Sequence, residues 1–170
     1  VAHYFTNNSP LRKGTLVMLD VGAKVSGYSA DLTRTYAVGK PTKRMQAVHG
    51  AVQRAQHEIT DMLKPGLSIE EYQTRVDAIV KREMIGLNII ENVEDEKGYR
   101  RHFPYAVSHG LGVDLHDALG RPSEFQPGMV ITVEPGIHLA DEKIGVRIED
   151  DILITENGYR NLSAKLTTDL

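Results

Sequence analysis

The sequence predicts an α+β domain built from two similar halves. One observation is a repeated pattern in which a glycine, an apolar run, an acid and a second glycine follow one another. It occurs at residues 14–22 and again at residues 128–136. A second observation is that helix-like periodic segments lie between the two copies. Together they favour two pseudo-symmetric halves whose antiparallel sheet is covered by helices.

Each copy of the pattern ends its apolar run with an acid. The runs at residues 16–19 and 129–133 have the length and side-chain types of buried strands, and Asp20 and Glu134 follow them. A buried carboxylate without a partner is costly or stays protonated. These acids therefore predict a cation or a hydrogen-bond network close by.

A second acid follows in each half, on the next extended segment. These acids are Asp31 and Glu149. If the halves pack about a pseudo-twofold axis, four carboxylates converge at one centre, and we expect a dinuclear metal site there. Asp150 and Asp151 are left out of the ligand set because we expect them beside the site or in a turn.

The composition narrows the classes of function. The chain has 170 residues with 41% apolar content, which is enough for one core and one domain over residues 1–170. The absence of cysteine excludes disulfides and thiolate metal sites. A net charge of −3 gives no basic field for nucleic acid. No segment resembles a membrane span or a signal peptide, so we expect a cytoplasmic protein with neither a membrane nor a nucleic-acid partner.

Two helices are expected between the hairpins. Apolar residues recur at spacings of three and four over residues 42–64, and a Pro-Gly pair ends the pattern. Ser68 followed by Glu71 fits a capping box for a second helix. Residues 91–101 lack periodicity and carry mixed charge, which favours an exposed loop.

Histidines and an arginine add to the acids. His109 and His116 lie in a glycine-rich segment, where imidazoles could serve a metal or a substrate. Either could also be an ordinary surface or core histidine, but the four acids favour the metal. Arg147 shares a strand face with Glu149 and could orient that ligand or bind substrate, with a surface arginine as the alternative.

Four carboxylates and one imidazole form an oxygen-rich donor set. Such a set suits Mn2+ best, with Co2+ and Zn2+ as compatible alternatives. Two such ions about 3.5–4 Å apart hold a bridging water and lower its pKa toward neutrality. Hydrolysis is therefore the chemistry that the residues predict.

Five ordered motifs point to a family. They occupy residues 16–22, 30–36, 108–117, 132–136 and 146–151. In this order they resemble the catalytic domain of the pita-bread metallopeptidases, specifically the Xaa-Pro branch of aminopeptidase P and prolidase, over nearly the whole chain. The resemblance implies the pita-bread fold and a metal-dependent peptidase.

The resemblance also implies roles for individual residues. Five residues would hold two divalent ions: Asp20, Asp31, His109, Glu134 and Glu149. Asp31 and Glu149 would bridge the ions, and Glu134 would also carry a proton from the attacking water to the leaving nitrogen. A prolyl nitrogen has no N–H before cleavage and must be protonated as it leaves. His3 and His116 match family histidines that act on the substrate, and Arg147 joins them in the catalytic set.

The implied activity is cleavage between an N-terminal residue and proline, by a metal-bridging hydroxide. The main alternative is an Xaa-Pro dipeptidase, and the compact motif from His109 to Asp117 favours the aminopeptidase. A methionine aminopeptidase shares the scaffold, but the Thr33-Arg34-Thr35 context resembles the Xaa-Pro branch more closely. A non-catalytic peptide-binding module is disfavoured because all five ligands are present.

Two features depart from the family pattern. Tyr105 stands where many relatives have a histidine, so it leaves substrate preference open, with aromatic packing as an alternative role. The chain also starts at Val1 within a strand-like segment, whereas family catalytic domains have a helical layer before it. We therefore expect a piece of a longer chain that associates with its N-terminal part or forms a homo-oligomer.

Overall fold

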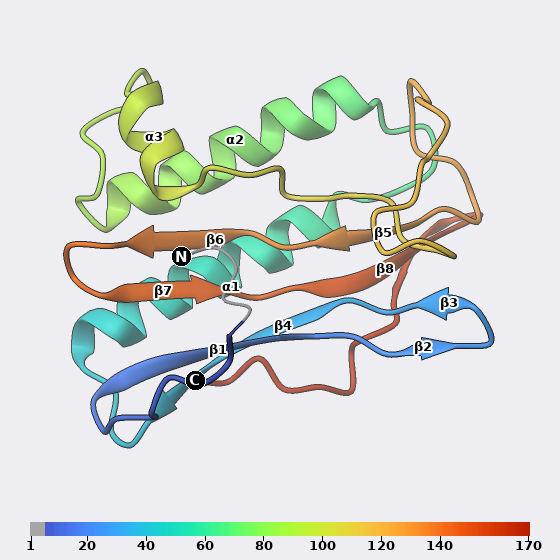
Figure 1. The fold of residues 1–170 in the computed structure, drawn as a ribbon. Helices are drawn as coiled ribbons and strands as arrows, with labels where there is room; N and C mark the ends of the chain where they lie inside the picture. Colours follow the sequence, from blue (N-terminus) through green and yellow to red (C-terminus); the bar gives the residue numbers. More distant parts are fainter. Residues whose placement is uncertain (1–5) are drawn as a thin grey trace.

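The computed structural model describes residues 6–170, in which helices cover antiparallel strands (Figure 1). In chain order the elements are β1 (Thr15–Val21), β2 (Lys24–Val25), β3 (Tyr28–Ser29), β4 (Leu32–Val38), α1 (Lys43–Asp61), α2 (Ile69–Gly86), α3 (Glu96–His102), β5 (Val130–Val133), β6 (Gly136–Leu139), β7 (Ile144–Arg147), β8 (Asp150–Thr155) and β9 (Gly158–Asn161). The two expected hairpin systems, separated by helices, are thus present.

The strands pair antiparallel within each half. The first half pairs β1 with β4, and the second half pairs β5 with β8 and β6 with β7. One isolated antiparallel bridge, between Thr33 and Glu149, connects the two halves. This bridge brings β4 next to the segment between β7 and β8. It thereby sets the distance between the predicted acids of the first half and those of the second.

The two long helices begin at the predicted positions. The Thr42 side chain caps α1 by accepting the N–H of Met45 at 3.1 Å, and the Ser68 side chain caps α2 by accepting the N–H of Glu71 at 3.1 Å. The apolar stripe of α1 contacts β5, β6 and β7 and is buried there. Fully burying one such side chain contributes roughly 1.5–3 kcal/mol, so this face fixes the helix on the second half.

The expected exposed loop at residues 91–101 is wrong in its second part, where α3 forms. Asp95 caps this helix by accepting the N–H of Gly98 at 2.8 Å, and three basic residues in its last turn complement the helix dipole. Tyr99 is completely buried, and its hydroxyl donates to Asp77 at 2.6 Å. The mixed charges therefore cap and anchor a short helix, a role that periodicity could not reveal in seven residues.

The first half is more exposed than the second. Leu19 and Val21 on β1 are 46% and 59% exposed, and Val25 and Tyr28 project from the β2–β3 hairpin. The second half lies beneath α1 and α2 (Figure 1). Among residues 6–170, no helix has the length and apolar character needed to cross a membrane.

Candidate metal centre

The sequence-predicted site forms one cavity of about 190 Å³ between the two halves and the segment after α3. Its walls include every predicted site residue within the described part of the chain: Asp20, Asp31, His109, His116, Glu134, Arg147 and Glu149. Tyr105, Ala106 and Ser108 complete the lining. His3 lies outside the described residues, so its predicted role stays a prediction.

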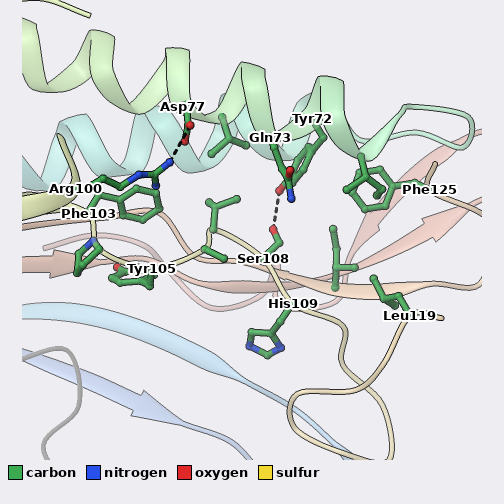
Figure 2. A pocket seen from close by; sticks show the side chains of 16 residues that line it. Tyr72, Gln73, Asp77, Arg100, Phe103, Tyr105, Ser108, His109, Leu119 and Phe125 are labelled. Carbon is green, nitrogen blue, oxygen red and sulfur yellow. Dashed lines mark hydrogen bonds and ion pairs between the residues drawn. The ribbon is translucent and has the colours of Figure 1, made fainter. Parts of the chain in front are cut away.

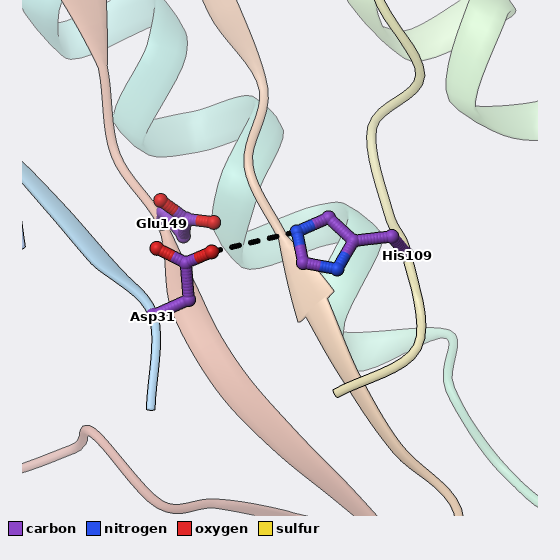
Figure 3. Close-up of side chains that lie close together, drawn as sticks. All are labelled: Asp31, His109 and Glu149. Atoms are coloured by element: carbon purple, nitrogen blue, oxygen red, sulfur yellow. Dashed lines mark ion pairs between the residues drawn. The ribbon is translucent and has the colours of Figure 1, made fainter. Parts of the chain in front are cut away.

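Three of the five predicted ligands form a compact group, shown in Figure 3. Asp31, His109 and Glu149 each present a ligand atom within 4.8 Å of the others. His109 Nε2 lies 3.5 Å from Asp31 Oδ2 and also 3.5 Å from Glu134 Oε1. His109 Nδ1 lies 2.9 Å from the Gly110 carbonyl, which only accepts, so Nδ1 carries the proton. In the neutral ring, Nε2 is then free to bind a metal.

Backbone contacts from both halves hold the acids of this group. The N–H of Asp31 donates to Asp151 Oδ2 at 3.2 Å, and the N–H of Glu149 donates to the Thr33 carbonyl at 3.0 Å. Glu134, which lies outside the compact group, is held within its own segment, where its Oε1 accepts the Thr132 hydroxyl at 3.3 Å. The group is therefore assembled by pairing between strands that are far apart in the sequence.

Asp20 reaches the cavity differently, because its carboxylate pairs with Arg147. Arg147 is only 2% exposed, which excludes the alternative of a surface arginine. Its Nε donates to the Thr33 hydroxyl at 3.1 Å, and that hydroxyl donates to Glu149 Oε2 at 2.5 Å. Arg147 and Glu149 both face the cavity, as strand alternation predicts.

Thr33 is a site residue that the sequence reasoning missed. It connects Arg147 to Glu149 through its hydroxyl and receives the Glu149 N–H on its carbonyl. The available signal was its spacing, since it lies two residues after Asp31 and alternation favours the same face. A partner 116 residues away could not be read from that spacing.

The electrostatics of the cavity show an excess of negative charge. Burial raises the pKa of Glu149 to about 8, with the charge of Glu134 as the next cause. Burial also raises the pKa of Glu134 to about 7. For His109, burial alone would lower the pKa, but the contacts with Asp31 and Gly110 and the Glu134 charge raise it to about 9. A bound cation would replace these protons and compensate the charge of the carboxylates, so the site favours cation binding.

The donor set fits a divalent metal ion. Carboxylate oxygens outnumber the single imidazole nitrogen, which is the composition that Mn2+ and similar ions prefer. Asp151 Oδ1 is also buried without a hydrogen-bond partner among residues 6–170, which adds to the uncompensated negative charge beside the cavity. Asp151 itself receives the Asp31 N–H, consistent with its exclusion from the predicted ligand set.

His116 lies against His109, one of the predicted ligands. The rings of His116 and His109 stack with centroids 4.1 Å apart and planes 18° apart. The glycines of this segment allow the chain to fold back so that Asp117, next to His116, lies close to Gly110, next to His109. A Cβ at Gly110 would lie 2.4 Å from the Asp117 carbonyl oxygen. A Cβ at Gly112 would likewise lie 2.2 Å from the Asp117 carboxylate. His116 therefore lines the cavity without joining the compact group.

Tyr105 separates the cavity from a larger one of about 540 Å³ beneath α2, shown in Figure 2. Its hydroxyl lies 3.1 Å from His138 Nε2, and the Arg147 guanidinium lies 5.7 Å from its ring centroid. A Cβ at Gly136 would lie 2.2 Å from the same hydroxyl. Tyr105 thus both packs, as one alternative proposed, and borders the site.

The described residues adopt the pita-bread fold of the aminopeptidase P structures. The solved structure of a proline aminopeptidase P II from Yersinia pestis matches 99% of this chain with a TM-score of 0.91 and 37% sequence identity, and the match covers 43% of that chain. The sequence pattern of metallopeptidase family M24 matches residues 1–156. The chain belongs to metallopeptidase family M24, which implies divalent metal ions.

Two relatives illustrate the resemblance within the family. An Xaa-Pro aminopeptidase of Escherichia coli is 36% identical over 183 residues, and the match covers 98% of this chain. The human Xaa-Pro aminopeptidase 3 is 36% identical over 177 residues, and the match covers 95% of this chain. The chain spans 42% of the length of the first relative and 35% of the second.

Proposed function

We propose that residues 1–170 form the catalytic domain of an Xaa-Pro aminopeptidase, which hydrolyses the bond between an N-terminal residue and proline. The observation that carries the proposal is the single cavity that unites seven residues predicted from separate motifs. The names of the Escherichia coli and human relatives support the substrate class. An Xaa-Pro dipeptidase activity is the alternative that the assay below separates.

In this proposal the five predicted ligands hold two divalent ions, with Mn2+ preferred: Asp20, Asp31, His109, Glu134 and Glu149. Asp31 and Glu149, which reach the site from opposing halves, would be the two carboxylates shared between the ions. When bound, the ions polarise the scissile carbonyl and lower the pKa of a water between them.

Glu134 serves as the proton carrier. Its Oε1 lies 3.5 Å from His109 Nε2, and burial brings its pKa to about 7, where a carboxyl group both accepts and releases a proton. As the water oxygen attacks the carbonyl carbon, Glu134 takes the water proton. It then delivers that proton to the prolyl nitrogen as the C–N bond breaks, so that water is added across the peptide bond.

His116 and Arg147 act at the edges of this reaction. The exposed His116 imidazole, held against His109, donates a hydrogen bond to the carbonyl oxygen as negative charge develops there. Arg147 is buried and holds Asp20 directly and Glu149 through Thr33, so it positions two ligands. Its contribution is orientation, since its hydrogen bonds are already directed to protein groups.

Metal stoichiometry followed by an activity assay tests the proposal. We expect calorimetry and element analysis to show two Mn2+ ions per metal-stripped chain, and expect the loaded chain to cleave a Gly-Pro-Ala type tripeptide. The same assay with an Xaa-Pro dipeptide distinguishes the dipeptidase. Failure to bind any divalent ion would contradict the proposal, as would cleavage of Met-Ala peptides in preference to both proline substrates.

A further inference from the structure

A second arginine, Arg34, lies directly behind the metal cavity. It belongs to β4 and is flanked by Thr33 and Thr35, whose side chains bond to residues of the second half. Because side chains alternate along a strand, Arg34 points away from the cavity. It is nevertheless 6% exposed, so a charged group is buried on the far side of the strand that carries part of the site.

The Arg34 guanidinium has a hydrogen-bond partner for every N–H. Nη1 donates to the carbonyls of Thr33 (2.9 Å) and Glu149 (2.6 Å), Nη2 to Asp150 Oδ1 (2.6 Å) and the Leu166 carbonyl (3.3 Å), and Nε to the Thr167 carbonyl (3.0 Å). Five donors in a fixed planar fork match five acceptors from β4, the β7–β8 connection, β8 and the C-terminal segment.

Asp150 is equally well satisfied. While Oδ1 accepts from Arg34, Oδ2 accepts from the Gln56 amide of α1 at 2.9 Å and from the Asn161 amide of β9 at 2.7 Å. The side chain of Asp150 is 4% exposed. The ion pair is therefore anchored to the covering helix and to the strand beyond β8, and it cannot shift without breaking several bonds.

The position of Arg34 Nη1 links this network to the metal centre. Thr33 and Glu149 form the one isolated bridge between β4 and the second half, and Nη1 bonds to the carbonyls of both. On the cavity side of the same bridge, the Thr33 hydroxyl donates a hydrogen bond to the Glu149 carboxylate. Asp31, another predicted ligand, lies two residues before Thr33 in the chain. One guanidinium thus bonds to both residues of the bridge that joins the two halves behind these carboxylates.

We propose that Arg34, anchored by Asp150, is a positioning residue that sets the spacing of Asp31 and Glu149 for metal binding. This inference rests on the proposed function, because it concerns the same ions. Partners outside the direct ligands typically contribute 10–100-fold to metal affinity, so loss of the pair should weaken Mn2+ binding by about that factor. A pair that only stabilised the fold would leave the affinity of the folded chain unchanged.

The double variant Arg34→Met/Asp150→Leu separates these two roles. Replacing a buried ion pair with apolar groups of similar volume is often neutral or stabilising, whereas removing one partner leaves a buried charge unpaired. Thermal unfolding of the metal-free chain measures stability, and calorimetric titration with MnCl2 measures affinity. The matched control, Arg75→Met/Glu71→Leu, removes an exposed ion pair on α2 that is remote from the cavity.

We expect the double variant to fold with a lower unfolding temperature, because the Gln56 and Asn161 amides and several carbonyls lose their partners. We expect the folded variant to bind Mn2+ about 10–100-fold more weakly, while the control binds normally. A folded double variant with unchanged Mn2+ affinity would overturn the positioning role. If the double variant does not fold, Arg34→Lys decides, because lysine keeps the charge beside Asp150 but cannot reach both bridge carbonyls. Unchanged affinity in Arg34→Lys would likewise overturn the inference.

The natural chain, titrated alongside, keeps the two proposals distinguishable. Mn2+ binding by the natural chain with equal binding by the variants would reject only the role of Arg34. Absence of Mn2+ binding by the natural chain would reject the metal centre and this inference with it. Weakened binding in the variants alone supports both.

Discussion

The two hairpin systems carry the same pattern of acids but hold them in different surroundings. On β1, the Asp20 side chain is 39% exposed and pairs with Arg147. In the second half, whose strands α1 contacts (Figure 1), Glu149 is 2% exposed. The two halves thus differ: the first acid of one half is neutralised by a protein cation, whereas the second acid of the other half is buried without an ion pair among residues 6–170.

This difference predicts where a bound metal ion would have the greatest effect. Burial and the neighbouring charge of Glu134 raise the pKa of Glu149, so its carboxylate form is costly in the absence of a cation. Asp20 already has the Arg147 guanidinium as its partner. We therefore expect metal binding to depend most steeply on the second half.

The largest effect should follow from Glu149→Ala, which removes a carboxylate that we propose is shared between two ions. We expect the loss of both Mn2+ binding and hydrolysis, by well over the ~10–100-fold typical of changes outside the direct ligands. Isothermal titration with MnCl2 and a tripeptide assay measure the two effects. Glu156→Ala, at an exposed acid in the turn before β9, is the control and should bind and cleave normally. Full activity in Glu149→Ala would remove the basis for the proposed site.

His116→Ala should separate rate from metal binding. Its ring stacks on His109 but does not belong to the compact ligand group, so we expect normal Mn2+ stoichiometry and a rate lowered by about 10²–10³-fold. Steady-state kinetics at saturating Mn2+, together with element analysis, provide the measurement. Loss of an ion from this variant would reassign His116 to the metal shell.

Thr33→Val should weaken Mn2+ binding, as the loss of a ligand would, but to a smaller extent. The change keeps the side-chain shape but removes the hydroxyl that joins Arg147 to Glu149. We expect Mn2+ affinity to fall by about 10-fold, and not beyond ~100-fold. Thr74→Val, on the exposed face of α2, removes a comparable hydroxyl far from the site and should change nothing. Equal affinities for the two variants would show that the Thr33 bridge is dispensable.

Stability against pH should reveal the buried acids of the second half. Because the folded-state pKa of Glu149 rises from 4.5 to about 8, and that of Glu134 from 4.5 to about 7, the folded chain binds more protons than the unfolded chain in this range. Stability of the metal-free chain is therefore greatest below pH 4.5 as far as these groups are concerned, and falls as pH rises to about 8. The raised pKa of His109, about 9, extends the loss in the same direction.

Thermal unfolding with and without Mn2+ at pH 5.5 and pH 8 measures this contrast. We expect Mn2+ to raise the unfolding temperature more at pH 8, by at least about 5 °C, since each kcal/mol moves it by roughly 2–4 °C in a chain of this size. In Glu149→Ala the metal-free chain should lose less stability between the two pH values. A Mn2+ effect that is larger at pH 5.5 would contradict the assignment of protons to these acids.

Much of this arrangement followed from local pattern. The apolar runs, the two capped helices and the acids at strand ends were each marked by periodicity or by turn residues close in sequence. The short helix α3 was not, because seven residues are too few for a period and its anchor, the Tyr99 hydroxyl bond to Asp77, joins distant segments. Long-range partnership likewise hid Thr33, Arg34 and the pairing of Asp20 with Arg147.

The glycines that follow the two strand acids provide the finest comparison of the halves. A Cβ at Gly22 would lie 1.9 Å from the backbone oxygen of Ala30, within its own hairpin. A Cβ at Gly136 would lie 2.2 Å from the Tyr105 hydroxyl and 2.9 Å from the Val146 carbonyl oxygen. In the first half, a backbone oxygen excludes a side chain at the repeated glycine. In the second half, the main obstacle is the Tyr105 side chain, which belongs to another segment.

The stabilities of Gly22→Ala and Gly136→Ala should therefore respond differently to the additional substitution Tyr105→Phe. We expect Gly136→Ala to destabilise the chain by about 1–3 kcal/mol and Tyr105→Phe to recover part of that loss by removing the hydroxyl. Gly22→Ala should gain nothing from Tyr105→Phe, because its obstacle is backbone. Gly86→Ala, at the end of α2 with open space around it, is the neutral control. Denaturant unfolding of the four single variants, and of Gly22→Ala and Gly136→Ala each combined with Tyr105→Phe, measures the coupling. Equal rescue of both glycine sites would show that the two halves do not differ in this way.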